Sequence, residues 1–460
     1  MPDLVATAVS GVSTASSATA REFDVVIVGG GMVGASLALA LADTGLEVML
    51  IEGVAPGSTA QPSFDDRTTA LGNASRRIFE GLGVWSAMAP EASAIRTIHV
   101  SDAGRFGFAR LNAGEQGVEA FGYLISNRVI GRALWGRLQS AKGITLRVPA
   151  RTESVQIAAD GVTLAVVGAD GSSREGRMSA NKESTGTASG ADGADGVVEQ
   201  IRARLVVAAD GAHSSVRAAA GIAAEVEDYD QVAMVANVRA DRPHDGTAYE
   251  RFTPSGPLAV LPLHDGSYGV VWSAQPAEAT RVLALSDEAF LSELQSRFGW
   301  RAGLFVRAGR RSSYPLKLTR AATTVATRAV LIGNAAQALH PVAGQGFNLG
   351  LRDAAMLAEL LASTRGGSSG SVSGDTNTDP GSPELLARFE AWRSGDRGGV
   401  IRFTDGLIKL FGDARPGVGL ARNFGLLLFD LMPPAKSALA RVSAGFAGPA
   451  PRLARGLAVK

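Results

Sequence analysis

The chain has 460 residues, 46% of them hydrophobic, which is enough for a large buried core divided between two or three domains of roughly 150 residues. Its 45 basic and 44 acidic residues leave a net charge of +1, which excludes the global positive field that a nucleic-acid-binding protein needs. The absence of cysteine excludes disulfides, thiolate nucleophiles and cysteine-held metal clusters, and it favours a reducing, cytosolic setting.

Histidine and glycine usage narrow the chemistry further. The five histidines are scattered singly, without the i, i+4 spacing that places two imidazoles on one helical face, so we expect no metal site. The 56 glycines exceed the usual share of about 7% of residues. Backbone amides and an organic cofactor are therefore the expected source of chemistry.

The N-terminal segment and two internal stretches have the composition of unfolded chain. Residues 1–21 have an acidic start and no apolar block of the length that a secretory signal requires, so they predict a disordered leader. Residues 168–198 and 365–383 are mostly Gly, Ser, Thr and Asp, with almost nothing to bury. They predict low-complexity surface insertions.

The segment after the leader has the pattern of a dinucleotide-binding unit. An apolar strand over 23–28 leads into Gly29, Gly31 and Gly34, and a helix follows. These glycines permit a tight turn, close approach of a pyrophosphate to the helix N-terminus, and close helix packing. A second strand ends at Glu52, about 20 residues on, where a carboxylate accepts hydrogen bonds from ribose hydroxyls. These features together predict a Rossmann-like domain.

The middle of the chain has a different pattern. Between about 230 and 320, apolar and polar residues alternate, as in 258–263 and 267–274, with a turn signal at 264–266. This alternation predicts the sheet of a second domain. After Arg328 the pattern returns to a strand followed by a helix, so we expect the first domain to be discontinuous in the sequence.

Two further glycine-containing motifs follow predicted strands. They are the pair Asp210-Gly211, and the pair Gly333-Asn334 with the following run His340-Pro341 and the turn Gly344-Gln345-Gly346 that opens a helix.

With these motifs the chain resembles the class A flavoprotein monooxygenases, the group of para-hydroxybenzoate hydroxylase. Residues 66–71, 127–128 and 333–353 make it most similar to the FAD-dependent hydroxylases of ubiquinone biosynthesis, and within them to the 2-polyprenyl-6-methoxyphenol hydroxylase branch. The resemblance covers nearly the whole chain outside the leader and the insertions. It implies FAD as cofactor, NAD(P)H as electron donor and O2 as a substrate.

The resemblance also implies where the cofactor is held. The first glycine motif would hold the ADP half of FAD, the second would lie near the pyrophosphate and the NAD(P)H path, and the third would contact the ribityl chain and the flavin. The helix that starts near 346–348 would direct amide donors at the side of the ring where negative charge collects on reduction. The implied cofactor-binding residues are Gly29, Gly31, Gly34, Glu52, Arg67, Arg128, Asp210, Gly211, Gly333, Asn334, Gly344, Gly346 and Asn348.

Some of these assignments have ordinary alternatives. Arg67 and Arg128 are equally well interpreted as surface charges. His340 and Pro341 are the catalytic candidates, and the alternative for His340 is an ordinary loop histidine. Asn334 and Gln337 depart from relatives that more often have Asp and His there. A neutral Asn still accepts a hydrogen bond through its carbonyl oxygen, but the stronger charge-assisted bond is lost.

The expected fold is α/β, with a Rossmann-like FAD-binding domain, an inserted β-rich substrate domain and a helical C-terminal region. We expect the C-terminal helix to be broken at Pro416 and at Pro433-Pro434. The FAD-binding domain takes residues 22–100, 120–168, 199–228 and 328–400, the substrate domain takes 101–119 and 229–327, and the C-terminal region takes 401–460.

The C-terminal region combines positive charge with apolar residues. From 400 to 460 there are nine Lys or Arg, Arg422 and Lys436 among them, against three Asp, and the run 424–432 is largely apolar. Such a surface can lie on an anionic bilayer, and the alternative is packing on the protein or on a partner. We expect a cytoplasmic enzyme associated peripherally with the inner membrane, with other ubiquinone-biosynthesis proteins as candidate partners.

The function that the sequence favours is hydroxylation of a polyprenylated methoxyphenol in ubiquinone biosynthesis. One alternative is a flavin monooxygenase of another aromatic or isoprenoid substrate. The other is a weakly catalytic, flavin-binding subunit of a biosynthetic complex.

Overall fold

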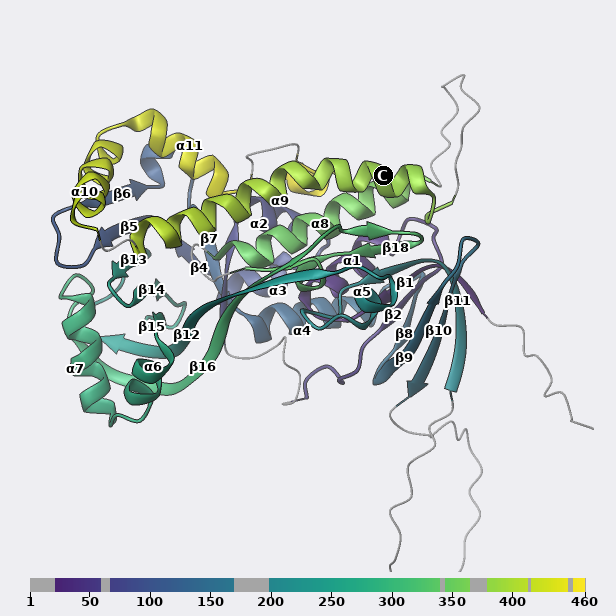
Figure 1. Cartoon of the computed structure of the whole chain (residues 1–460), viewed down its shortest axis with the longest axis horizontal. Coiled ribbons are helices and arrows are strands. Elements are labelled where there is room, and N and C mark those ends of the chain that lie inside the picture. The colour runs from purple at the N-terminus through teal and green to yellow at the C-terminus, as the bar shows by residue number, and fades with distance from the viewer. Residues whose placement is uncertain are drawn as a thin grey trace, which may run out of the picture.

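The computed structural model describes residues 21–58, 67–168, 198–339, 344–364, 379–412, 415–445 and 450–459. The predicted leader up to residue 20, most of both predicted insertions, and His340 and Pro341 lie outside these residues. The described part is elongated, with one large sheet near each end and a long helix running between the two ends (Figure 1). It is mixed α/β with a helical C-terminal region, which confirms the expected fold class.

The first sheet has a parallel centre in the order β18-β11-β1-β2-β8, extended by the antiparallel strands β17, β10 and β9. Its strands are β1 (Glu22–Val28), β2 (Val48–Ile51), β8 (Ile144–Arg147), β9 (Ala150–Ile157), β10 (Val162–Gly168), β11 (Val198–Ala208), β17 (Val325–Ala326) and β18 (Ala329–Leu331).

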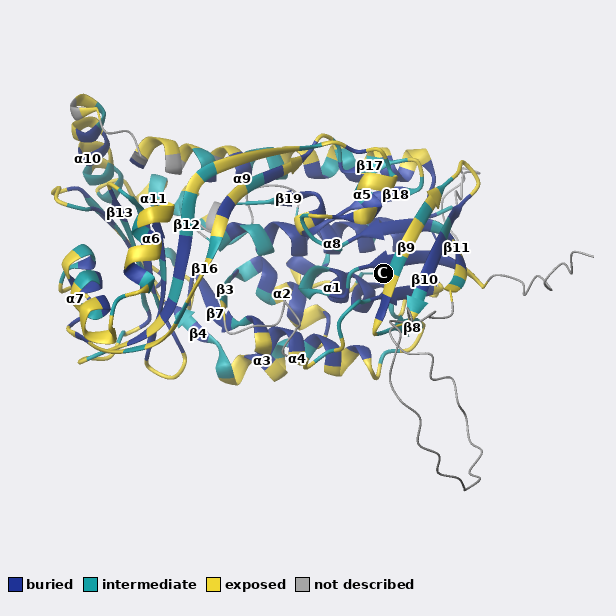
Figure 2. Ribbon diagram, turned by 60° about the horizontal axis from the view of Figure 1, so that its bottom comes forward, coloured by how far each residue is buried: buried dark blue, intermediate teal, exposed yellow. Residues whose placement is uncertain are grey.

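Both faces of this sheet are covered, and for that reason its central strands are apolar throughout. Successive side chains of a strand point to opposite faces, so Val25 and Ile27 pack under the helices, whereas Val26 and Val28 pack against the β9–β10 side. The central strands are buried in Figure 2. The covering helices include α1 (Met32–Leu41), α4 (Asn127–Leu138) and α8 (Gln345–Ser363) on one side and α5 (Ser215–Ala219) on the other.

The second sheet has the order β19-β16-β12-β15-β14-β13-β5-β6. Its strands are β5 (Thr97–Asp102), β6 (Phe108–Asn112), β12 (Ala224–Ala240), β13 (Thr247–Thr253), β14 (Gly256–Pro262), β15 (Tyr268–Ala274), β16 (Phe305–Ala321) and β19 (Gln337–Ala338). One face packs under α6 (Pro276–Leu283) and α7 (Asp287–Phe298), where Trp272 is fully buried. The other face is left for the cavity described below.

A small third sheet lies between the two large ones. It pairs β3 (Thr68–Gly72) and β4 (Ser93–Ile95) with β7 (Gly122–Ser126). The short helices α2 (Asn73–Gly81) and α3 (Trp85–Met88) follow β3 in the chain.

The C-terminal region is helical, as the sequence predicts, and it breaks at the predicted prolines. Its helices are α9 (Pro383–Gly412), α10 (Pro416–Asp430) and α11 (Pro433–Ser443). The 30-residue α9 runs along the molecule from the first sheet to the second, so that α10 and α11 lie at the second-sheet end (Figure 1). No helix in the described ranges has both the length and the apolarity needed to cross a membrane.

Candidate active site

One large cavity connects all three sheets with the C-terminal helices. It has a volume of about 2010 Å³ and is lined by the glycine turn after β1, by β3, by the start of α8, by the free face of the second sheet and by α10. Ordinary small-molecule pockets measure about 300–1,000 Å³. The cavity therefore has room for a dinucleotide and a second molecule together.

The glycine turn between β1 and α1 can be built only with glycines at two positions. Gly29 has φ +104°, and a side chain there would collide with the carbonyl of Ala209, while a side chain on Gly34 would collide with the carbonyl of Gly29. Gly31 is the N-cap of α1, where no side chain caps the helix and the first turn has no acidic residue. The amides at this helix end are thus suited to a bound anion.

Glu52 lies where the sequence predicts it, directly after β2 and in the cavity lining. Its Oε2 accepts a hydrogen bond from the Gly30 amide at 2.6 Å, and its Oε1 accepts one from the Val54 amide at 2.9 Å. The Trp135 indole N–H donates to the Gly30 carbonyl at 3.1 Å. The carboxylate and the glycine turn therefore fix each other's position.

Hydrogen bonds connect the second glycine motif, Asp210-Gly211, to the third. Asp210 accepts hydrogen bonds at Oδ2 from the amide and the hydroxyl of Ser215, and its Oδ1 is buried without a partner among the described residues. The Arg217 guanidinium donates to the carbonyls of Ala212, at 2.7 Å, and Ala335, at 2.9 Å. Asp210 and Gly211 line the cavity next to the third motif.

The third motif lies against α1 and at the start of α8. Gly333 has φ +58° and packs against Val33 of α1, and the exposed Asn334 beside it lines the cavity. Gly344, with φ +59° in the left-handed region, caps α8, which begins at Gln345, one residue before the predicted start.

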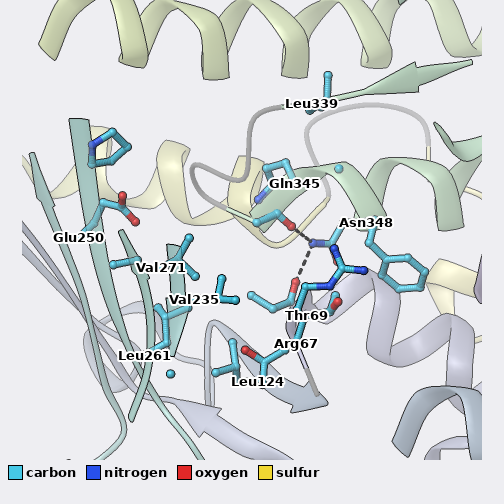
Figure 3. Close-up of a pocket in the computed structure, with 18 of the residues that line it drawn as sticks. Arg67, Thr69, Leu124, Val235, Glu250, Leu261, Val271, Leu339, Gln345 and Asn348 are labelled. Carbon is cyan, nitrogen blue, oxygen red and sulfur yellow. Dashed lines mark hydrogen bonds between the residues drawn. The ribbon is translucent and has the colours of Figure 1, made fainter. Parts of the chain in front are cut away.

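Asn348 joins this helix end to the third sheet. Its Oδ1 accepts hydrogen bonds from the Gly72 amide at 2.9 Å and the Ser75 hydroxyl at 2.6 Å. Its Nδ2 donates to the carbonyls of Ala70 and Gly344, both at 2.8 Å (Figure 3). The side chain is fully engaged, so it positions the wall of the cavity.

Gln337 lies behind this wall, buried in an ionic cluster that the sequence does not reveal. Its Nε2 donates to Asp353 Oδ2 at 2.9 Å, and Asp353 is paired through Oδ1 with Arg393 of α9. Arg393 also pairs with Asp396, whose pKa is lowered by Arg352 and Arg393 against the opposing effect of burial. The cluster ties α8 to α9.

Most of the expected cofactor-binding residues line the cavity. Arg67 does so with its guanidinium 5.5 Å from the centre of the Tyr314 ring. Gly34 and Arg128 are not among the residues that line it: Gly34 is inside α1, and Arg128 is exposed on α4. The members of the predicted set in the lining are Gly29, Gly31, Glu52, Arg67, Asp210, Gly211, Gly333, Asn334, Gly344, Gly346 and Asn348.

Opposite these residues the second sheet forms an apolar wall with one acid in it. Val235, Leu261 and Val271 extend into the cavity, and so does Glu250 (Figure 3). Burial raises the pKa of Glu250 to about 7. Sequence reasoning missed this residue, although an acid in phase with Ala248 and Phe252 on one face of a strand was a usable signal.

The expectation that Arg422 and Lys436 offer surface charge is wrong. Arg422 is only 8% exposed and donates to Asp102 Oδ2 at 2.7 Å and to the Leu410 carbonyl at 2.8 Å, because α10 packs against β5 and β6. Lys436 is largely buried and forms an ion pair with Asp430 at 2.8 Å. A linear charge count cannot distinguish such paired cations from free ones.

Comparison with known proteins gives a consistent set of relatives. Residues 22–379 match a family model described as FAD binding domain. The chain is 37% identical over 439 residues to the ubiquinone hydroxylase UbiL of Rhodospirillum rubrum, which covers 94% of this chain and 93% of that protein. It is 30% identical over 412 residues to the 3-demethoxyubiquinol 3-hydroxylase of Escherichia coli, covering 89% and 95%.

Among solved structures, the p-nitrophenol 4-monooxygenase PnpA from Pseudomonas putida has the same fold. The TM-score is 0.71 over 93% of this chain and 99% of that chain, at 19% sequence identity.

Proposed function

The chain belongs to the FAD-binding domain family, and from this membership we propose that it is a monooxygenase that hydroxylates the ring of a polyprenylated phenol in ubiquinone biosynthesis. The observation that carries the proposal is the large cavity that joins the glycine turn after β1 to an apolar wall and to α10. The names of the relatives support the substrate class.

The residues at the first-sheet end of the cavity fit FAD. The uncapped start of α1 would hold the pyrophosphate, Glu52 the ribose, and the start of α8 the flavin. When bound, FAD takes electrons from NAD(P)H and activates O2 for transfer to a ring carbon. The protein orients the two molecules and keeps water out with the apolar wall.

The substrate would lie between the start of α8 and the second sheet. The inner face of α10 extends the apolar lining with Val418, Leu426 and Phe429, which provides a path for a prenyl tail. We favour a methoxyphenol ring because of the similarity at residues 333–353.

The outer face of α10 supports docking on a membrane. Phe424, Leu428 and Leu431 are 57%, 59% and 70% exposed. Arg105 and Arg301 line a shallow groove beside Leu420. Apolar side chains with arginines beside them fit an anionic bilayer, from which a polyprenyl tail can enter the cavity along α10.

The test is hydroxylation by the purified holoenzyme. With a short-chain prenylated methoxyphenol, NAD(P)H and labelled O2, we expect a product with one labelled oxygen on the ring. The variant Gly31→Val should lose FAD, because its side chain would occupy the space of the pyrophosphate.

The outcomes separate the proposal from its alternatives. Turnover of unprenylated or isoprenoid substrates alone would favour a different monooxygenase. Stoichiometric FAD without NAD(P)H oxidation under any phenol would favour a weakly catalytic subunit, and normal FAD content in Gly31→Val would remove the glycine turn from the cofactor site.

A further inference from the structure

Among the described strand residues of the second sheet that line the cavity, one is an acid, Glu250. Glu250 is on β13, paired in the sheet register with Val100 of β5 and Ala259 of β14, and all three line the cavity. Ala248 and Phe252 are on the same face of β13. The Glu250 side chain has no hydrogen-bond or ion-pair partner among the described residues. A buried acid without a partner lowers the stability of the folded protein, so we expect it to interact with a bound ligand.

The direction of the side chain points to the substrate. In Figure 3, Glu250 extends from the sheet into the space whose other side is formed by Thr69 of β3 and by Gln345 and Asn348 at the start of α8. The proposed function places the flavin at that helix end. A ring held between the two sides would therefore meet the carboxylate with its polar edge.

We propose that Glu250 is the catalytic base that accepts the proton of the substrate's phenol hydroxyl, an inference that rests on the proposed function. The O–H bond breaks, the proton goes to a carboxylate oxygen, and the electron pair stays on the phenol oxygen, which makes the adjacent ring carbon more electron-rich. That carbon receives one oxygen atom of O2, and the other oxygen atom is reduced to water by the two electrons that NAD(P)H supplies. The ring carbon then releases its hydrogen to solvent as a proton, and Glu250 returns its own proton to the phenol oxygen.

The environment of Glu250 suits this role. Burial is the cause that raises the pKa of its carboxyl to about 7. The pKa of a phenol is about 10, and a carboxyl group with a pKa of about 7 lies closer to this value than an ordinary carboxyl group does. Such a group is still ionised above pH 7, so it can accept the proton. Four other charged residues of the lining contribute nothing to the shift: Arg310 and Lys317 of β16, Asp265 of the turn between β14 and β15, and Arg422 of α10.

The first test compares the full-length holoenzymes of the wild type, Glu250→Gln and Glu227→Gln, with a short-chain prenylated phenol. Glu227 is an exposed glutamate of β12 in the same sheet and serves as the matched control. We expect Glu250→Gln to keep its FAD and its NAD(P)H oxidation but to lose about 100-fold in kcat for hydroxylation, the usual scale for a general base. The wild type and the control should lose kcat as the pH falls below about 7, and Glu250→Gln should lose this dependence.

A binding measurement provides a readout that does not depend on turnover. Titration of the oxidised holoenzyme at pH 8 with the same phenol and with its methyl ether, followed by flavin absorbance, should show about tenfold tighter binding of the phenol, worth about 1.4 kcal/mol. The preference should shrink in Glu250→Gln and persist in the control.

The inference is overturned if Glu250→Gln keeps the wild-type kcat and pH profile, or if the wild type binds phenol and ether equally. A wild type that holds FAD and prefers the phenol, yet hydroxylates no prenylated phenol, would instead contradict the proposed function and leave Glu250 as the phenol-binding group.

Discussion

We expect Glu250 to make the stability of the protein depend on pH. Burial raises its pKa from an ordinary value of 4.5 to about 7, so between these values the folded protein binds more protons than the unfolded chain. Stability contributed by this group therefore falls as the pH rises from about 4.5 to about 7. We expect Glu250→Gln to be more stable than the wild type at pH 8, by up to about 3 kcal/mol at 1.36 kcal/mol per pH unit.

Urea unfolding of FAD-saturated protein at pH 5 and pH 8 measures this effect. The two proteins should differ little at pH 5 and clearly at pH 8. An equal difference at both values would show that the carboxyl is not desolvated in the folded state.

Arg422 provides a second prediction at the scale of one residue. Its guanidinium donates through Nε and one terminal nitrogen to Asp102, which also accepts from Asn423. Arg422→Glu would place two carboxylates in this buried site, so we expect a loss of about 3–5 kcal/mol in the free energy of unfolding, as for other broken buried pairs. Arg441→Glu, at an exposed position of α11, should change it by about 0.5 kcal/mol or less. Similar melting temperatures for the two variants would contradict the pairing.

Asn334 tests the third motif. If its side chain hydrogen-bonds the ribityl chain, Asn334→Ala should weaken FAD binding by about 1–2 kcal/mol, the cost of a neutral hydrogen bond with a buried partner left behind. Calorimetric titration of the apoprotein with FAD measures this, and unchanged affinity would remove Asn334 from the site.

At the scale of elements, the close contact between α1 and the glycine turn restricts which residues can replace Gly34. A methyl group on Gly34 would overlap the carbonyl of Gly29, so Gly34→Ala must push α1 away from the turn. We expect a lower melting temperature and loss of FAD. Gly136→Ala on α4, where an added methyl group meets nothing within 4 Å, should be neutral or stabilising by up to about 1 kcal/mol. Normal FAD content in Gly34→Ala would show that the turn tolerates the shift.

The elements with a strong local signal are the ones that the sequence predicts well. The strand, glycine turn and helix at 23–41 and the helix breaks at Pro416 and Pro433 depend on neighbouring residues, and the structure confirms them. Glu250 and the partner of Arg422 depend instead on which strands and helices meet. Asp102 and Arg422 are 320 residues apart in the chain, and no local pattern links them.

At the scale of the whole molecule, the residues that we propose to hold the cofactor and those that we propose to hold the substrate tail lie at opposite ends of one cavity. The glycine turn follows β1 of the first sheet, α9 runs along the molecule between the two large sheets, and α10 lies at the second-sheet end (Figure 1). The residues Val418, Leu426 and Phe429 on the inner face of α10 line the cavity. Because Leu420 and Leu428 face outward on the same helix, α10 is apolar on both sides. A helix with two apolar faces can bury the outer one against a second apolar surface, and we propose that this surface is a bilayer that also holds the substrate tail.

We therefore expect the wild type to float with anionic liposomes at low salt and to be released as the salt concentration rises, because each arginine near the surface adds about 1 kcal/mol of attraction. Phe424→Glu combined with Leu428→Glu should abolish flotation, since each large apolar side chain contributes about 1.5–3 kcal/mol when fully buried. Both residues are exposed, so FAD content and melting temperature should stay normal. The matched control, Val226→Glu with Val306→Glu, changes two exposed apolar residues of β12 and β16 and should bind liposomes like the wild type. If the wild type ignores anionic liposomes, or if the α10 variant still floats, then α10 does not dock on the bilayer, and the tail must reach the cavity from a protein partner.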